Sequence, residues 1–436
     1  MHSRDKEAQE GQDNTSCAST TSTPTASSPV VTHDPYQALR YRNFRLLLIG
    51  NLIASMGEQM FLVAIGWELY ERTNSALALG LVGLVQVVPA IFLSLPGGDL
   101  ADRVNRKTIM IITLFSLAAG SVGLTALSIT RGPLLLIYGC LLLMGAAAAF
   151  YNPASIALVS QTVPENAYTS AATWDSSSWQ LASVVGPGLG GLLIAVLHSA
   201  APIYLLNAGA ALIFATLLIF MRLARQSGER AEGTALHSLL EGITFLGKTQ
   251  VLLAAITLDL FAVLLGGATT LLPIFARDIL QVGPTGLGWL RAAPSIGAIC
   301  ITLGLAYLPP FTRAGRTLLL AVAGFGVATI IFGLSRSFWL SLVMLFALGG
   351  FDNISVVIRS TLLLTRTPGV MRGRIAAVNS LFIVASNQLG GFESGVTAQF
   401  FGPTISVVAG GIGTILVVLL VAWLWPDMRR LRSLHG

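Results

Sequence analysis

Long apolar runs separated by short polar stretches dominate the pattern of this 436-residue chain. Each run has roughly the 20 residues that an α-helix needs to cross a bilayer. The runs are continuous and not alternating, which excludes a transmembrane β-barrel. Their approximate ranges are 44–70, 75–97, 108–130, 133–158, 171–197, 202–221, 251–275, 285–308, 317–335, 338–363, 375–398 and 403–425. The pattern predicts an all-α polytopic membrane protein with twelve transmembrane helices.

The polar stretches indicate how the chain is divided. Residues 1–34 are polar and include a block rich in Ser, Thr, Ala and Pro, so we expect a disordered N-terminal tail and not a signal peptide. The longest internal polar stretch, 223–249, splits the spans six and six. We therefore predict an N-terminal six-helix bundle over 35–222, a cytoplasmic inter-bundle loop over 223–249 and a C-terminal six-helix bundle over 250–436.

Composition and charge agree with this class of protein. Hydrophobic residues make up 54% of the chain and charged residues 11%, whereas soluble domains carry about 25% charged residues. The net charge of +6 fits a basic cytoplasmic face better than nucleic-acid binding. If the N-terminus is cytoplasmic, the outer loops hold only Arg72, Arg131, Arg277 and Arg336. We therefore expect a multi-pass protein of the inner (plasma) membrane with both termini in the cytoplasm.

The two halves of the chain show a weak internal repeat. The run LVGLVQVVP, which ends at Pro89, reappears as LGWLRAAP, which ends at Pro294. This register aligns Gln86 with Arg291. Related halves are typical of transporters, so we expect two six-helix bundles related by a pseudo-twofold axis.

Enzyme signatures are absent from the sequence. No P-loop pattern occurs, the five His residues are scattered, and no Ser/His/Asp arrangement can be argued. Cys17, Cys140 and Cys300 suggest neither a disulfide framework nor a metal site. We expect a protein that is not an enzyme and needs no metal or cofactor.

A short charged run, GGDLADRVNRK over 97–107, lies between the second and third predicted spans. At this run the chain resembles the major facilitator superfamily, whose signature loop is matched at Gly98, Leu100, Ala101, Asp102, Arg103, Arg106 and Lys107. The resemblance implies a conformational gate, in which the loop contacts neighbouring helices and holds the outward-open state. Position 105 departs from the pattern, with Asn in place of the usual Gly. Because Asn also tolerates a left-handed backbone, we expect the turn to be kept.

Two further stretches narrow the resemblance. Gly186, Pro187, Gly190 and Gly191 belong to a GPGLGG run that resembles the GPxxGG motif of drug/proton antiporters and also suits close helix packing. The runs 372–374 and 386–395 resemble the branch of efflux permeases that includes bacterial enterobactin exporters. The resemblance implies secondary active export of a siderophore-, drug- or metabolite-like molecule by alternating access.

Charged side chains inside the predicted spans are candidates for function, because a bilayer tolerates them only where they face protein or water. The candidates are Glu58, Glu68, Asp175, Asp259, Arg291, Asp352, Arg359 and Glu393. Glu58 lies near the midpoint of the first span, and in this superfamily the first helix lines the central cavity. It could exchange a proton for substrate. The alternative is a neutral Glu that hydrogen-bonds a neighbouring helix.

The other candidates are assigned by position. Asp352 and Arg359 are seven residues apart, two helical turns, so they share one helix face and could both line the cavity. Arg359 could instead snorkel at the cytoplasmic end and brace an inner gate. Asp175 lies close enough to the 97–107 run to be its partner in gating. We assign Glu68, Asp259, Arg291 and Glu393 to the cavity or to a gate.

These observations favour a monomeric proton antiporter that exports a small molecule. Its expected partners are the substrate, protons and the lipid bilayer, and no nucleic acid. Two alternatives remain open, namely a permease for nutrient uptake or facilitated diffusion, and a non-transporting sensor or lipid-handling protein on the same fold. The sequence does not identify the substrate.

Overall fold

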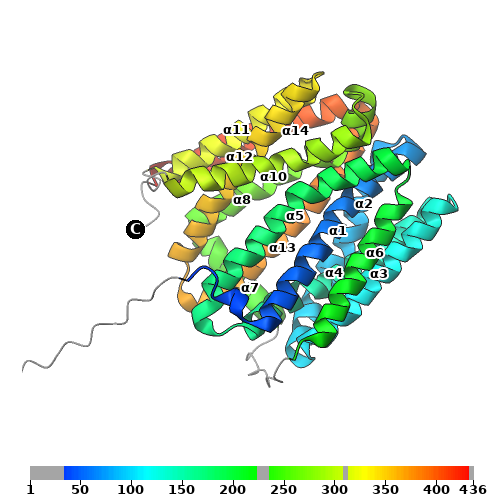
Figure 1. Cartoon of the computed structure of the whole chain (residues 1–436). Helices are drawn as coiled ribbons and strands as arrows, with labels where there is room; N and C mark the ends of the chain where they lie inside the picture. Colours follow the sequence, from blue (N-terminus) through cyan, green and yellow to red (C-terminus); the bar gives the residue numbers. More distant parts are fainter. Residues whose placement is uncertain (1–33, 223–234, 308–312, 432–436) are drawn as a thin grey trace, which may run out of the picture. The chain divides into compact units, whose positions relative to one another are not determined.

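The computed structural model describes residues 34–222, 235–307 and 313–431, which form helices joined by turns. Twelve helical segments in these ranges are long and apolar enough to cross a membrane, which confirms the predicted all-α fold (Figure 1). The first six are α1 (Arg42–Thr73), α2 (Ala76–Arg103), α3 (Arg106–Ile129), α4 (Leu134–Thr162), α5 (Tyr168–Leu197) and α6 (Ala201–Phe220). The second six are built on α8 (Gln250–Leu265), α10 (Gly283–Tyr307), α11 (Ala314–Leu334), α12 (Phe338–Arg366), α13 (Arg372–Phe401) and α14 (Pro403–Leu424).

Both halves pair their helices in the same way. In the first half α1 packs on α5 and α6, and α3 packs on α4 and α6. In the second half α8 packs on α13 and α14, and α11 packs on α12 and α14. The equivalent pairings agree with the predicted pair of related six-helix bundles.

Glycines allow the two halves to approach each other closely. Across the halves, α2 packs on α13 and α5 packs on α10. A Cβ atom placed on Gly80 would lie 3.0 Å from Gly395 Cα, and one on Gly191 would lie 3.0 Å from Gly288 Cα. Small residues let the backbones of membrane helices touch, so these two crossings form tight contacts between the bundles.

The seventh span is irregular, which its uniform apolar pattern did not predict. After α8 ends at Leu265, the span continues through a 3₁₀ turn (Ala268–Leu271), the short α9 (Leu272–Ile274) and a π-helical segment (Phe275–Ile279). Gly267 sits at the break, where a Cβ atom would lie 2.6 Å from the carbonyl oxygen of Gly390 on α13. Irregular backbone in a membrane helix is tolerated where protein surrounds it, and such breaks often mark functional sites.

The spans have two ends, which we name after one residue at each. The Tyr70 end carries the connections that follow α1, α3, α5, the seventh span, α11 and α13. The Arg106 end carries the starts of α1 and α3 and the short C-terminal helix α15 (Pro426–Arg430).

A further helix, α7 (Ala235–Lys248), lies within the stretch that the sequence analysis treated as a loop over 223–249. It packs on α13 and α2, and Glu241 on α7 forms an ion pair with Arg374 on α13. Leu236, Ile243 and Leu246 recur at helical spacing, a signal of an amphipathic helix that is too short to span a bilayer.

The charged run between the second and third spans is mostly helical. Helix α2 continues to Arg103 and α3 begins at Arg106, so only Val104 and Asn105 form the turn. Asn105 has φ −57°, and its side-chain oxygen accepts a hydrogen bond from the Lys107 amide at 3.0 Å. The turn is kept as expected, but Asn105 does not use the left-handed backbone that Asn tolerates. Asn serves here as a helix N-cap, which satisfies an otherwise unpaired amide at the start of α3.

The gate residues of this run can be followed only in part. The surroundings of Gly98 and the side chains of Asp102 and Arg103 lie outside what the structure describes, and Arg106 begins α3. The Lys107 ammonium donates to the carbonyl oxygens of Ile219 at 3.0 Å and Met221 at 2.8 Å. A cation at these last carbonyls favours the C-terminal end of α6, so Lys107 ties α3 to α6.

Candidate functional site

Glu58 lies near the middle of α1 on a face that points towards other helices of the first half. It is seven residues from Asn51, two helical turns, so the two side chains share a face. Asn51 bonds to α4 and α5 on that face, and Glu58 interacts electrostatically with Tyr151 of α4. Glu58 is nevertheless exposed. An exposed carboxyl group on an inward helix face can be reached by protons or substrate.

Polar side chains of three helices lie near Glu58, and we call Asn51, Glu58, Tyr151 and Asp175 together the Asn51 cluster. The Tyr151 hydroxyl donates to the Asn51 side-chain oxygen at 3.1 Å. The Asn51 amide nitrogen donates to Asp175 Oδ1 at 2.9 Å. The cluster joins α1, α4 and α5 within the membrane-spanning part of the first half.

Asp175 was predicted to partner the 97–107 run. Its partner in the structure is Asn51 on α1, while the Asp102 and Arg103 side chains lie outside the described residues. The gate contact therefore stays a prediction. Asp175 is instead placed with Glu58 in one cluster.

Asp259 on α8 and Arg359 on α12 form an ion pair inside the second half. Arg359 is 4% exposed and Asp259 is 7% exposed, so both are buried. Arg359 therefore does not snorkel to the membrane surface, and its part in an inner gate stays a prediction. The Coulomb attraction of Asp259 holds its charge inside the bundle. The Arg359 Nε has no hydrogen-bond acceptor among the described residues.

Asp352 lies close to this ion pair. A cavity of about 10 Å³ is lined by both carboxylate residues, Asp259 and Asp352, and by Phe351 and Ser355. That volume is about the size of one water molecule. That Asp352 and Arg359 both line the transport cavity stays a prediction. In the structure, Asp259 pairs with Arg359 and lines this small cavity together with Asp352.

Two of the candidate carboxylates, at the Tyr70 end, are bonded to a residue one turn along their own helix. Glu68 pairs with Arg72 one turn along α1 at 2.5 Å, and Arg72 donates to the carbonyl oxygens of Leu127 and Ser128. Glu393 accepts a hydrogen bond from Thr397, one turn along α13, at 2.9 Å. These contacts suit a structural role near the end of the spans better than a role in the centre.

Three charged candidates have no hydrogen-bond or ion-pair partner among the described residues, namely Glu58, Arg291 and Asp352. Arg291 lies on α10 one turn from Gly288, which touches α5 of the other half. Asp259, Arg359, Glu68, Glu393 and Asp175 each have a bonded partner. An unpaired charge within a membrane span is expected at a substrate or proton site. Glu58, Arg291 and Asp352 are therefore the strongest candidates for such a site.

The GPGLGG run is where α5 touches both halves. A Cβ atom on Gly186 would lie 2.6 Å from Gln59 Cβ of α1, and one on Gly190 would lie 3.0 Å from Met60 Cα. Gly191 faces α10 instead, at Gly288. Through this motif, α5 contacts both α1 of its own half and α10 of the other half. Pro187 lies within the same helix.

Contacts at the Tyr70 end join the two halves. The sequence pattern did not predict them. The Tyr70 hydroxyl donates to the Asp278 carboxylate, and the Arg277 guanidinium lies over the Tyr70 ring at 5.5 Å. Arg277 also donates to the Asn74 side-chain oxygen at 2.9 Å. Only the charge pair Arg277–Asp278 at a span end could have signalled this site. These contacts link α1 to the seventh span at the Tyr70 end.

The described residues contain no group of three His, Cys, Asp or Glu side chains that could hold a metal ion. The polar contacts of the site come from charged, amide and hydroxyl side chains, which make the ion pair and the hydrogen bonds described above.

Comparison with known proteins places these features in a family. A family model described as "Transmembrane secretion effector" matches residues 33–431. The chain is 27% identical over 408 residues to the multidrug efflux pump Tap of Mycolicibacterium fortuitum, covering 88% of this chain and 96% of the relative. It is 28% identical over 393 residues to the enterobactin exporter EntS of Escherichia coli O1:K1 / APEC, covering 89% and 93%.

Solved structures share the fold at low sequence identity. The nucleoside transporter NupG superposes with a TM-score of 0.71 at 11% identity, over 88% of this chain and all of that one. A bacterial homologue of the human lysosomal transporter Spinster, in an inward-facing and occupied conformation, gives a TM-score of 0.69 at 13% identity, covering 91% and 98%. These similarities confirm the fold of the two related bundles.

Proposed function

Because the chain belongs to the transmembrane secretion effector family of the major facilitator superfamily, we propose that it exports a drug-like or siderophore-like molecule in exchange for protons. It is a multi-pass transporter and not an enzyme. The substrate class follows the relatives, one named a multidrug efflux pump and the other an enterobactin exporter.

The orientation in this proposal follows from charge. Lys and Arg collect in cytoplasmic loops, and the Arg106 end is the richer of the two in these residues. We therefore place the Arg106 end and both termini in the cytoplasm, in the inner (plasma) membrane, and treat the working unit as a monomer. In this orientation the contact of Tyr70 with Asp278 closes the outer side. Alternating access then requires these contacts to break when substrate leaves.

The proton step rests on one observation, the unpartnered Glu58 on an inward face at the middle of α1. The hydrogen bond from Tyr151 to Asn51 fixes the ring beside Glu58, and Asp175 holds Asn51 from the other side. Glu58 can then bind a proton from outside and release it to the cytoplasm after the halves rock. In the same scheme a cationic substrate and a proton compete for the ionised form of Glu58.

The second half supplies the other charges of the transport path. Arg291 offers an unpaired cation to an acidic group of the substrate, and Asp352 offers an unpaired carboxylate. Asp259 holds Arg359 in place and keeps it from the substrate path. We assign the gates to the two ends. Tyr70, Asp278 and Arg277 act at the outer end, and the 97–107 run acts at the inner end.

The proposal is tested with purified protein in liposomes that contain a pH-sensitive dye. Candidate substrates are a catecholate siderophore, a macrolide and a cationic dye, each added against an imposed pH gradient. We expect at least one of them to move against its own gradient while protons move the other way. Transport that persists unchanged after an ionophore collapses the pH gradient would overturn proton coupling. Movement only down the substrate gradient would instead favour facilitated diffusion.

A further inference from the structure

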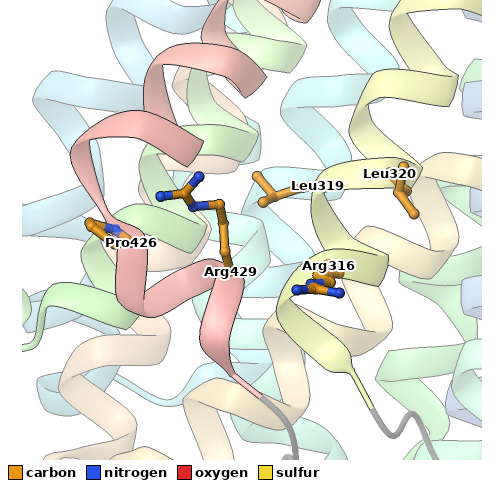
Figure 2. Close-up of a pocket in the computed structure, with 5 residues that line it drawn as sticks. All are labelled: Arg316, Leu319, Leu320, Pro426 and Arg429. Carbon is orange, nitrogen blue, oxygen red and sulfur yellow. The ribbon is translucent and has the colours of Figure 1, made fainter.

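A pocket lies at the Arg106 end of the second half, and none of the charged candidates within the spans lines it. Its volume is about 400 Å³, and it is lined by Arg316, Leu319 and Leu320 of α11 and by Pro426 and Arg429 at α15. Figure 2 shows the two arginines on neighbouring elements, with Leu319 between them. A volume of this size suits a small ligand or the head of a larger one.

The backbone holds α15 firmly against the start of α11. A side chain on Gly315 would collide with the Met428 carbonyl group, and the Gly315 amide donates to the Leu431 carbonyl oxygen at 3.4 Å. Met428 is fully buried at this contact. The chain turns after α14 at Trp425 and Pro426, and α15 then places Arg429 in the lining of the pocket that Arg316 also lines. The pocket is therefore a built feature that Gly315 makes possible.

The two arginines are available to a ligand. Both are exposed, and within the described ranges neither has an ion-pair or hydrogen-bond partner. Two guanidinium groups on one pocket match an oxyanion, because each can donate two parallel hydrogen bonds to phosphate oxygens.

The surroundings of the pocket point to a lipid as the source of the phosphate. Leu320 is 72% exposed, and the exposed residues Val327, Ile331 and Leu334 follow it at helical spacing along α11. An apolar strip of this kind faces the acyl chains of a bilayer. Basic pockets between membrane helices on the cytoplasmic side are typical sites for anionic lipid head groups.

We infer that Arg316 and Arg429 bind the phosphate of an anionic phospholipid of the cytoplasmic leaflet, with an acyl chain along α11. The bound head group bridges α11 and α15 and fastens the C-terminal segment to the second half. The inference rests on the orientation in the proposed function, but it needs neither proton coupling nor export. Lipid binding and transport are measured separately, so either can fail alone.

The test uses the full-length protein in detergent and native mass spectrometry, with phosphatidylglycerol and phosphatidylcholine as probes. We expect the protein to retain phosphatidylglycerol in preference to phosphatidylcholine. Each Arg that donates charged hydrogen bonds contributes roughly a tenfold change in affinity. The R316Q/R429Q variant should therefore bind phosphatidylglycerol at least roughly tenfold more weakly.

The matched control is R366Q, which removes an exposed arginine at the same end of the spans, on α12 and outside the pocket. R366Q should bind the lipid like the wild type. Gly315→Leu keeps both arginines but displaces α15, and should also weaken binding if the variant elutes as a monodisperse protein. Equal binding in the wild type and R316Q/R429Q would overturn the inference. If the wild type binds inorganic phosphate as well as it binds phosphatidylglycerol, and shows no preference between the two lipids, the inference is overturned and the pocket is a site for free phosphate.

Discussion

Asn51 on α1 donates a hydrogen bond to Asp175 on α5 across 2.9 Å, and the same side chain accepts from Tyr151 on α4. One amide thus satisfies two neighbours that lie 100 and 124 residues away. Glu58 lies two turns along the same face of α1. The arrangement explains how a mid-span carboxyl group can be held in a defined environment without an ion-pair partner of its own.

The first prediction concerns this amide. Asn51→Leu leaves the Tyr151 hydroxyl and the Asp175 carboxylate without their bond, and an unsatisfied polar group inside protein costs about 1–3 kcal/mol. We expect a lower unfolding temperature and a shifted pH dependence of transport, because the surroundings of Glu58 change. Thermal unfolding in detergent and transport at several pH values measure both.

The control for this variant is Tyr138→Phe. It removes the hydroxyl that donates to the Ala78 carbonyl oxygen at 3.0 Å, a hydrogen bond outside the Asn51 cluster. It should lower stability slightly and leave the pH dependence of transport unchanged. If Asn51→Leu and Tyr138→Phe give the same pH profile, the cluster has no role in the proton step.

The second prediction concerns the buried ion pair of Asp259 and Arg359. Removing one partner leaves an uncompensated charge inside the bundle, which costs about 3–5 kcal/mol. Asp259→Asn and Arg359→Met should each unfold at a clearly lower temperature than the wild type. Because paired removal leaves no lone charge, D259L/R359M should be more stable than either single variant. Additive losses in the double variant would mean that the two side chains do not depend on each other.

The third prediction separates two glycines of one motif. A side chain at Gly191 meets Gly288 across the contact between the halves, whereas a Cβ atom at Gly188 has open space around it. Gly191→Val should weaken closure at the Tyr70 end and populate the conformation open on that side. Gly188→Val serves as the matched control and should leave closure intact. Distances between spin labels placed on the two halves at that end measure the shift, and equal distributions in both variants would contradict it.

The sequence predicted the spans well because bilayer thickness imposes their length. The last span was expected over 403–425 and is Pro403–Leu424, and the tenth was expected over 338–363 and is Phe338–Arg366. Hydropathy carries no information about backbone geometry. The irregular end of the seventh span after Leu265 could therefore not be predicted from the apolar pattern. Helix α7 was missed because its polar flanks and short length resemble a loop.

Partners in the site were harder to predict than the candidates themselves. The residues Asp259 and Arg359 were both singled out, yet nothing in their spacing of 100 residues pairs them. The Asn51 cluster contains two uncharged members, Asn51 and Tyr151, that a search for charges in the spans passes over. Close packing at residues such as Gly186 and Gly190 decides which helix faces touch. This packing depends on the whole fold and cannot be read from one stretch of sequence.

The central claim is that Glu58 couples proton movement to export. The most direct measurement compares the wild type and Glu58→Gln in proteoliposomes, recording substrate flux and internal pH together across a series of imposed gradients. Our account predicts that Glu58→Gln still binds substrate and permits its downhill exchange, while proton movement coupled to substrate is lost. Full coupled transport in Glu58→Gln, with the proton-to-substrate ratio of the wild type, would contradict it.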